Sequence, residues 1–269
     1  MRAYISLILD VLRELFQLVY MVFQTHVRFR ISRLRRQGRD EEAEAVIAGV
    51  VIRWTRRLLD GLRCEVRVEG LEHVPAQGPY LIMANHQSKY DIPVLVGYLG
   101  VISGFLAKRE LFRLPGLAFW MQQIGCVPLN RKDVSGSIQV LASLGAELKA
   151  SGRTLILFPE GTRSRDPEGA IGPLRQGSLR LATDNEIPIL PVVLDGTRLL
   201  DSKQALLRTS GGGRYVRVRV LPLLNPGNLN GPQRKQLAEK LKNDLVSNHA
   251  QIRVNWDKPS PGRPTEAAG

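Results

Sequence analysis

A histidine and an aspartate five positions apart, His86 and Asp91, are the pair in this sequence best suited to acid–base chemistry. Asp91 stands where a helix is expected to begin, because Pro93 would fall in its first turn. A carboxylate across such a turn can fix the imidazole tautomer and leave the other ring nitrogen free to take a proton. The pair therefore indicates activation of an alcohol as a nucleophile, although an isolated histidine is more often structural.

Two basic segments could bind an anionic substrate. Lys108–Leu111 follows one predicted strand, and Gly125–Arg131 closes the next unit. The guanidinium of Arg131 could hold a phosphate through two hydrogen bonds. A solvated basic rim is an equally good interpretation of both segments.

The heptapeptide Phe158–Ser164 combines a carboxylate, a glycine and an arginine directly after a very apolar run. Gly161 lets the backbone approach a ligand closely, Thr162 can donate a hydrogen bond, and Arg163 can bind a phosphate with two nitrogens. Seen alone, the segment would be an ordinary surface turn.

A fourth cluster, Ile187–Val192, is apolar with two prolines, and it can shape an apolar wall or a rigid strand entry. We expect all four clusters to lie at the ends of strands. Loops at such ends converge on one edge of an open α/β sheet.

Short apolar or alternating runs that predict strands alternate with amphipathic stretches that predict helices. The predicted strands are Cys64–Val68, Tyr80–Met83, Ser103–Ala107, Cys126–Leu129, Thr154–Phe158, Ile189–Leu194 and Tyr215–Leu221. The predicted helices are Asp40–Leu62, Ile92–Leu99, Val134–Ala150, Leu174–Asn185 and Gln233–His249. This alternation predicts an α/β domain with a mixed, mostly parallel sheet of about seven strands flanked by helices.

The N-terminal segment Tyr4–Phe23 is mostly apolar, with polar residues recurring every three or four positions. No small-residue cleavage site follows, so a removed signal peptide is not expected. Each charge near the middle of a spanning helix would cost roughly 2.5–3.5 kcal/mol, which favours a helix lying in the membrane interface. Packing on the protein's own core is the alternative, and a spanning helix stays open. We expect this helix to pair with Asp40–Leu62 as a hairpin.

The chain divides into four predicted regions. Residues 1–62 form membrane-associated helices, 63–224 an α/β domain, 225–257 a linker and helix, and 258–269 a disordered tail. The formal net charge is +13, from 38 Lys and Arg against 25 Asp and Glu, which favours anionic lipid, phosphorylated substrates or nucleic acid as partners. Two cysteines, Cys64 and Cys126, indicate buried apolar side chains rather than a disulfide framework.

Taken in order, the four clusters resemble the four motifs of the glycerolipid acyltransferase family, the 1-acylglycerol-3-phosphate acyltransferases above all. The H-x4-D motif matches at His86 and Asp91. The second block matches at Lys108, Glu110, Leu111 and Gly125–Arg131. The third motif stands complete at Phe158–Ser164, and the fourth matches at Pro188 and Pro191. One mild departure is Asn130 before the arginine of the second block.

This resemblance implies a glycerol-3-phosphate acyltransferase-like fold and a reaction without an acyl-enzyme. His86 would be the general base, and Asp91 would orient it. Arg163 with Gly161 and Thr162 would hold the acceptor's phosphate. The remaining implied substrate-binding residues are Lys108 and Arg131, which would add positive charge, and Glu160, which would organise its loop. The donor would be acyl-coenzyme A or acyl carrier protein, with no cofactor or metal, at the cytoplasmic face of a membrane.

Other chemistries lack their motifs here. The sequence has no Gly-x-Ser-x-Gly elbow, His-Glu-x-x-His, Walker loop or Gly-x-Gly-x-x-Gly, so a serine acyl-enzyme, a metal hydrolase and a nucleotide cofactor are not indicated. Acylation of another lysolipid, such as a lyso-ornithine lipid or lysophosphatidylglycerol, stays open. A non-catalytic basic module that binds membranes or nucleic acid is more distant, because only 6% of residues are aromatic.

Overall fold

The computed structural model describes residues 24–130, 134–166, 169–201, 214–227 and 229–254, together with Leu12, Leu15, Val19 and Tyr20. Its centre is one seven-stranded sheet in the order β1-β7-β6-β2-β5-β3-β4. The strands are β1 (Cys64–Glu69), β2 (Leu81–Ala84), β3 (Ser103–Lys108), β4 (Val127–Leu129), β5 (Thr154–Leu157), β6 (Ile189–Asp195) and β7 (Arg214–Val220). Only β6 and β7 pair antiparallel among these strands, so the predicted mixed, mostly parallel sheet is confirmed.

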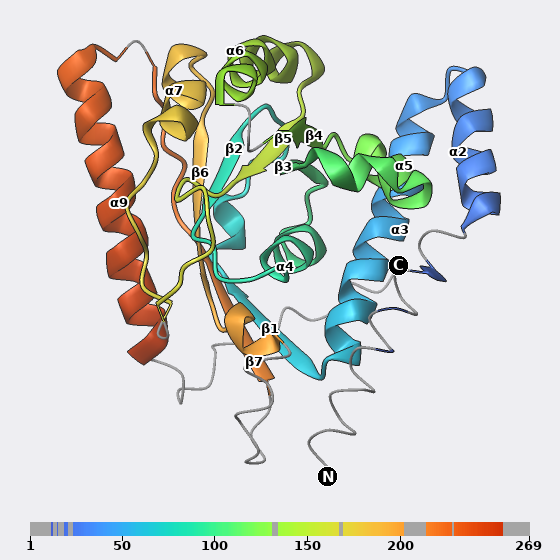
Figure 1. The fold of residues 1–269 in the computed structure, drawn as a ribbon, viewed down its shortest axis with the longest axis horizontal. Helices are drawn as coiled ribbons and strands as arrows, with labels where there is room; N and C mark the ends of the chain where they lie inside the picture. Colours follow the sequence, from blue (N-terminus) through green and yellow to red (C-terminus); the bar gives the residue numbers. More distant parts are fainter. Residues whose placement is uncertain are drawn as a thin grey trace.

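Helices connect the strands and cover both faces of the sheet (Figure 1). They are α2 (Thr25–Arg36), α3 (Asp40–Gly61), α4 (Asp91–Tyr98), α5 (Pro115–Gln123), α6 (Val134–Ser151), α7 (Gln176–Asp184) and α9 (Gly231–Val254). Three short 3₁₀ helices are η1 (Leu71–His73), η2 (Arg109–Arg113) and η3 (Thr197–Leu200).

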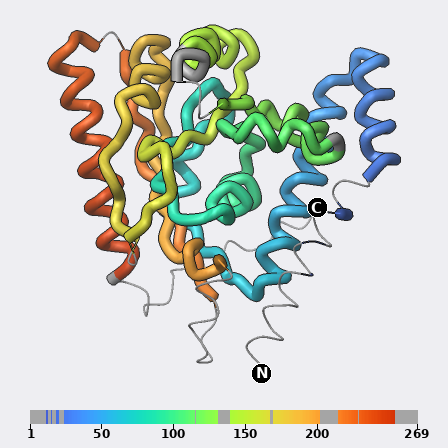
Figure 2. The backbone as a smooth tube through the Cα atoms, viewed as in Figure 1, coloured from blue at the N-terminus to red at the C-terminus, as the bar shows by residue number. Residues whose placement is uncertain are grey.

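Two apolar clusters, one on each face of the sheet, make this a three-layer fold. Residues of α2, α3, α4 and α5 form one cluster with strand side chains that point to one face of the sheet. Residues of α6, α7 and α9 form the other cluster with strand side chains that point to the opposite face. In β2, Ile82 and Ala84 belong to the first cluster, whereas Leu81 and Met83 belong to the second. A strand covered on both faces is apolar throughout, which explains why β2 has no polar residue. Figure 2 accordingly places α9 and the α2–α3 pair on opposite sides of the sheet.

In the sequence, the alternating valines and arginines of β7 are typical of a strand with one exposed face. In the structure, α9 covers part of that face. Val216, Val218 and Val220 are buried as their alternation predicts. The intervening Arg217 is buried as well, because it lies under the end of α9 and its Nη1 donates to the carbonyl of Ile252 at 3.3 Å. The strand is therefore covered on both faces.

N-terminal helices are present in the described residues. The arginine-rich segment forms α2, which packs beside α3 across a short turn and buries Ile31 and Leu34. The predicted partner of α3, Tyr4–Phe23, lies almost entirely outside the described residues. Within the part of the chain that the structure describes, no helix is both long and apolar enough to cross a bilayer.

The sequence analysis needs two corrections. It did not predict the helix α5, although a proline in the first turn, here Pro115, is a common helix start. The fourth cluster does not follow a strand: Pro188 precedes β6 and Pro191 lies within it, paired with Met83 of β2. Because β6 runs parallel to β2, its functional end is the opposite one, at Asp195.

Candidate active site

His86 and Asp91 are in direct contact at the carboxyl end of β2. The Nδ1 atom of His86 lies 2.6 Å from Oδ2 of Asp91. Asp91 begins α4 and its side chain is fully buried, whereas the His86 side chain keeps 14% of its surface exposed. Since Nδ1 is occupied by the carboxylate, Nε2 is the ring nitrogen left to exchange a proton with a ligand.

The Asp91 carboxylate is held on all sides. Its Oδ2 accepts hydrogen bonds from the backbone N–H groups of Gln87 at 2.7 Å and Ser88 at 2.9 Å, and its Oδ1 accepts one from the hydroxyl of Thr197. Several donors to one carboxylate fix its orientation. A carboxylate held in this way can keep the imidazole beside it in one tautomer and one orientation.

The loop after β5 supports the histidine from the other side. Phe158 stacks on the imidazole, with ring centroids 4.0 Å apart and planes 13° apart. The buried carboxylate of Glu160 accepts the backbone N–H of His86 at 2.8 Å and that of Gly172 at 2.9 Å. The backbone N–H of Ser164 donates to the carbonyl of His86 at 2.8 Å. The two loops are thus joined through the backbone of the histidine itself.

The next residues of this loop belong to the long excursion that the backbone makes between β5 and α7 (Figure 2). Gly161, Thr162 and Arg163 are exposed. Gly161 has φ +69°, and a Cβ there would lie 2.4 Å from Nε of Arg175, which itself donates to the Glu160 carbonyl. Only glycine suits both this backbone conformation and this close approach.

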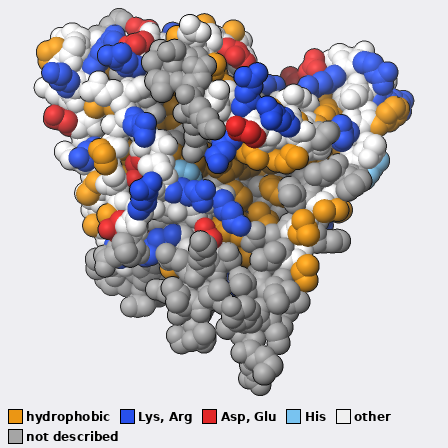
Figure 3. Space-filling view, in the orientation of Figure 1, with side chains coloured by type: hydrophobic (Ala, Val, Ile, Leu, Met, Phe, Trp, Pro, Cys, Tyr) orange, Lys and Arg blue, Asp and Glu red, His pale blue; other side chains and the backbone are white. Residues whose placement is uncertain are grey.

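A cavity of about 360 Å³ opens between this loop and the segment after β6, and the residue next to His86 in the chain, Gln87, lines it. Three arginines line it, Arg163, Arg165 and Arg198, together with two acids, Asp166 and Asp201. The arginines outnumber the acids, so the cavity is suited to an anion. Figure 3 shows Lys and Arg side chains gathered on this face, next to a recessed area of hydrophobic side chains beside α4 and α5.

Of the two remaining predicted phosphate ligands, Lys108 does not line this cavity. Lys108 is the exposed last residue of β3, which is separated from β2 by β5. It is not among the described residues that line the cavity. Arg131 lies outside the described residues. Their contribution to substrate binding stays a prediction.

The cysteines cannot serve as nucleophiles in this structure. Cys64 and Cys126 are both free and buried, which confirms the expectation from the sequence. Burial raises the pKa of each thiol to about 12. Both therefore stay protonated near neutral pH, where a thiol is a poor nucleophile.

Comparison with known proteins assigns the family. The model of the family described as Acyltransferase matches residues 65–195, a range that contains His86, Asp91 and the whole third motif. Residues 65–195 belong to the acyltransferase family.

Similarity to individual acyltransferases extends beyond this region. The chain is 32% identical to "1-acyl-sn-glycerol-3-phosphate acyltransferase alpha" of Ovis aries over 196 residues, which cover 71% of this chain and 64% of that protein. It is 33% identical to "1-acyl-sn-glycerol-3-phosphate acyltransferase" of Saccharomyces cerevisiae over 196 residues, 73% of this chain and 63% of the yeast protein. The chain thus spans slightly less than two thirds of the length of these curated relatives.

A solved structure matches nearly the whole chain. The 1-acyl-sn-glycerophosphate (LPA) acyltransferase PlsC of Thermotoga maritima superposes with a TM-score of 0.79 at 27% identity. The superposition covers 96% of this chain and all of that one. The similarity therefore includes the sheet and the helices on both of its faces, beyond the acyltransferase region alone.

The sequence analysis did not identify several polar residues around His86 and Asp91. Gln87 is buried, and its Nε2 lies 3.1 Å from Oδ1 of Asp195 and 3.2 Å from Nε2 of His249. Thr197 and Asp195 follow or end β6, so the strand-end argument that located His86 would have found them once β6 was oriented. His249 gave no such signal, because it comes from α9, 162 residues after Gln87.

Proposed function

We propose that this chain transfers a fatty acyl group from a thioester donor to the sn-2 hydroxyl of 1-acyl-glycerol-3-phosphate, forming phosphatidate. The observation that carries the proposal is the contact between His86 Nδ1 and the buried Asp91 carboxylate, which leaves Nε2 as the ring nitrogen that this carboxylate does not contact. The relatives reported above carry this acceptor in their names, which supports the same acceptor here.

In the proposed reaction, Nε2 of His86 accepts the proton of the acceptor hydroxyl as its oxygen attacks the thioester carbonyl. A new C–O bond forms, the C–S bond breaks, and the proton on the imidazolium passes to the departing thiolate. Asp91 stabilises the positive charge on the ring between these two steps. Base catalysis of this kind contributes about 10²–10⁴-fold in rate, and positioning of the hydroxyl supplies much of the rest.

The cavity between the loop after β5 and the segment after β6 supports an acceptor that carries phosphate. Arg163, Arg165 and Arg198 line it, and guanidinium groups bind phosphate through paired hydrogen bonds. The backbone of Ser164, which also lines the cavity, donates to the His86 carbonyl. A phosphate in the cavity would therefore lie on the loop that is tied to the base.

The donor would be acyl-coenzyme A or acyl carrier protein, both of which are anionic and suit a basic surface. We place the reaction at the cytoplasmic face of a membrane, where a lysophospholipid is available. Exposed apolar side chains near the N-terminus, Leu12, Leu15, Val19 and Tyr20, and Phe29 on the arginine-rich α2 support contact with a lipid surface.

Competition between acceptors tests the proposal. Purified protein in detergent would receive labelled long-chain acyl-coenzyme A and an equimolar mixture of lysophosphatidate, lysophosphatidylglycerol and a lyso-ornithine lipid. We expect labelled phosphatidate as the main product, because a phosphate monoester carries more negative charge than the other two headgroups.

A different main product would reassign the acceptor and keep the acyl transfer. If no product forms, acyl carrier protein loaded with the same chain replaces the donor. Absence of any product with either donor, together with salt-dependent binding of the protein to anionic vesicles or DNA, would favour a non-catalytic basic module instead.

A further inference from the structure

The hydroxyl of Thr197, in a segment outside the four motifs, donates a hydrogen bond to Oδ1 of Asp91. We propose that Thr197 is a positioning residue, which fixes the Asp91 carboxylate so that Oδ2 stays directed at His86. The inference deepens the proposed acyl transfer and rests on it for its kinetic consequences, but its structural part can be tested separately.

The two oxygens of Asp91 have different partners. Oδ2 contacts His86 Nδ1 and accepts the backbone N–H groups of Gln87 and Ser88, all of which come from the same loop as the histidine. Oδ1 receives the hydroxyl of Thr197, which comes from η3, more than one hundred positions away along the chain. The Thr197 contact therefore sets the rotation of the carboxylate from outside its own loop.

Thr197 is itself rigidly placed. It is completely buried at the start of η3, and the preceding Gly196 has φ +100°, a conformation that turns the chain inward after β6. The backbone N–H of Gly196 donates to Oε1 of Gln87 at 3.1 Å, and Thr197 Oγ1 lies 3.4 Å from the same oxygen. The Gln87 side chain thus bridges the loop after β2 and the segment after β6.

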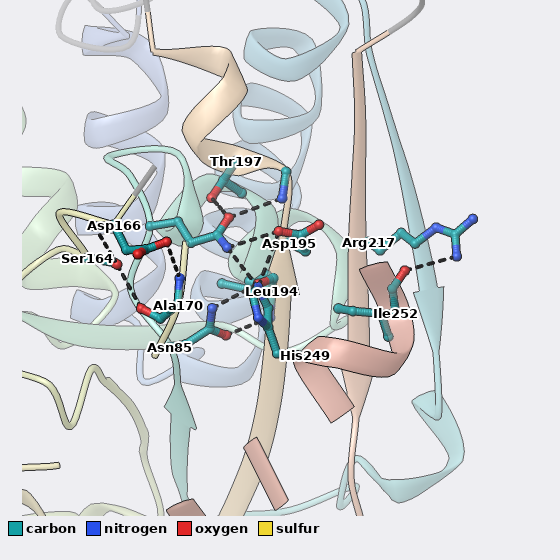
Figure 4. A network of polar contacts seen from close by, with 12 residues as sticks. Asn85, Ser164, Asp166, Ala170, Leu194, Asp195, Thr197, Arg217, His249 and Ile252 are labelled. Atoms are coloured by element: carbon teal, nitrogen blue, oxygen red, sulfur yellow. Dashed lines mark hydrogen bonds and ion pairs between the residues drawn. The ribbon is translucent and has the colours of Figure 1, made fainter. Parts of the chain in front are cut away.

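The far end of the Gln87 amide is also held. Its Nε2 donates to Asp195 Oδ1 at 3.1 Å, and His249 Nε2 lies 3.3 Å from that carboxylate oxygen (Figure 4). Asn85 adds a second connection, because its side chain exchanges two hydrogen bonds with the backbone of Leu194, at 2.8 and 2.7 Å. The helix α9, β6 and the loop after β2 therefore form one polar framework that ends at Thr197.

Loss of the hydroxyl would have a definite effect on the dyad. Without the Thr197 hydroxyl, Oδ1 loses the contact that fixes the rotation of the carboxylate, so Oδ2 would no longer be held toward Nδ1 of His86. The other ionisable groups around this framework, Glu160, Asp195 and His249, contact neither Asp91 oxygen by any described hydrogen bond and are unchanged by the substitution.

The test compares Thr197→Val, which keeps the shape and removes the donor, with Thr197→Ser, which keeps the donor. With lysophosphatidate and labelled acyl-coenzyme A, we expect kcat to fall about tenfold or more in Thr197→Val, with the acceptor KM within about twofold. Thr197→Ser should stay within about threefold of wild type. If the valine variant does not fold, Thr197→Ala takes its place under the same criteria.

A second readout does not depend on the substrate. The chain has four histidines, so the His86 imidazole signals can be followed by NMR and identified by their absence in His86→Gln. We expect the His86 imidazole signals to shift in Thr197→Val, because the contact with Asp91 is altered, and to return toward their wild-type positions in Thr197→Ser. Unchanged His86 signals in the folded valine variant would overturn the proposal. Shifted signals in a protein without acyltransferase activity would keep the positioning role and refute the proposed function alone.

Discussion

The loops after β2 and β5 are joined to each other but differ in how their functional side chains are held. The loop after β2 ends in a carboxylate that is fully buried and has hydrogen-bond partners on both oxygens. The loop after β5 buries its anchor, Glu160, and leaves Thr162 and Arg163 exposed. The group that would transfer protons is preorganised, whereas the groups that would bind the acceptor's headgroup are open to solvent.

This difference predicts separate kinetic consequences. Preorganised groups act mainly in the transition state, and their loss lowers kcat. Groups that meet a substrate's headgroup bind ground state and transition state alike, and their loss raises KM. Glu160 connects the two loops and should affect stability as well as turnover.

The largest effect is expected for Asp91→Asn. The amide removes the charge that stabilises the imidazolium, and its NH2 group cannot accept the hydrogen bonds that Gln87 and Ser88 donate to Oδ2. We expect kcat to fall by about 10²–10³-fold with a small change in the acceptor KM. Steady-state kinetics would measure both, with Asp184→Asn on the surface of α7 as the control. Retention of near-normal kcat would remove the carboxylate from the mechanism.

A smaller effect on turnover, with loss of stability, is expected for Glu160→Ala. The substitution leaves the N–H groups of His86 and Gly172 without their shared acceptor. We expect the free energy of unfolding to fall by about 3 kcal/mol and kcat by about tenfold. Urea unfolding and kinetics would be compared with Glu147→Ala, which removes an exposed acid in α6. Equal stability of the two variants would show that Glu160 does not join the loops.

Arg163→Ala should leave turnover nearly unchanged. We expect the KM for lysophosphatidate to rise about tenfold while kcat stays within about twofold, because an exposed arginine would contribute to headgroup binding. Arg180→Ala, which removes an exposed arginine from α7, is the matched control. A fall in kcat at constant KM would contradict the assignment of the β5 loop to binding and would end the contrast between the two loops.

The sequence was most informative where local pattern decides structure. The uninterrupted apolar run of β5 and the alternating valines of β7 predicted both strands to within a residue or two. His86 and Asp91 were found because both lie in one loop, separated by a single turn. In these cases the interacting residues are neighbours in the chain, so spacing alone carries the signal.

Long-range packing explains what the sequence did not reveal. Arg217 looked solvent-exposed until α9 covered it. The contact of Thr197 with Asp91 joins positions 106 residues apart, and no local pattern encodes it. The proline-containing fourth motif drew attention to the start of β6, whereas the side chains that reach the dyad come from its other end.

The central claim is that His86 is the base for acyl transfer to a lysophosphatidate hydroxyl. Its most direct test is a single-turnover measurement with labelled acyl-coenzyme A, excess protein and lysophosphatidate, using wild type and His86→Ala with matching circular dichroism spectra. We expect labelled phosphatidate from wild type and a rate at least about 10²-fold lower from His86→Ala. A folded His86→Ala protein that forms phosphatidate at a rate close to that of wild type would contradict the claim.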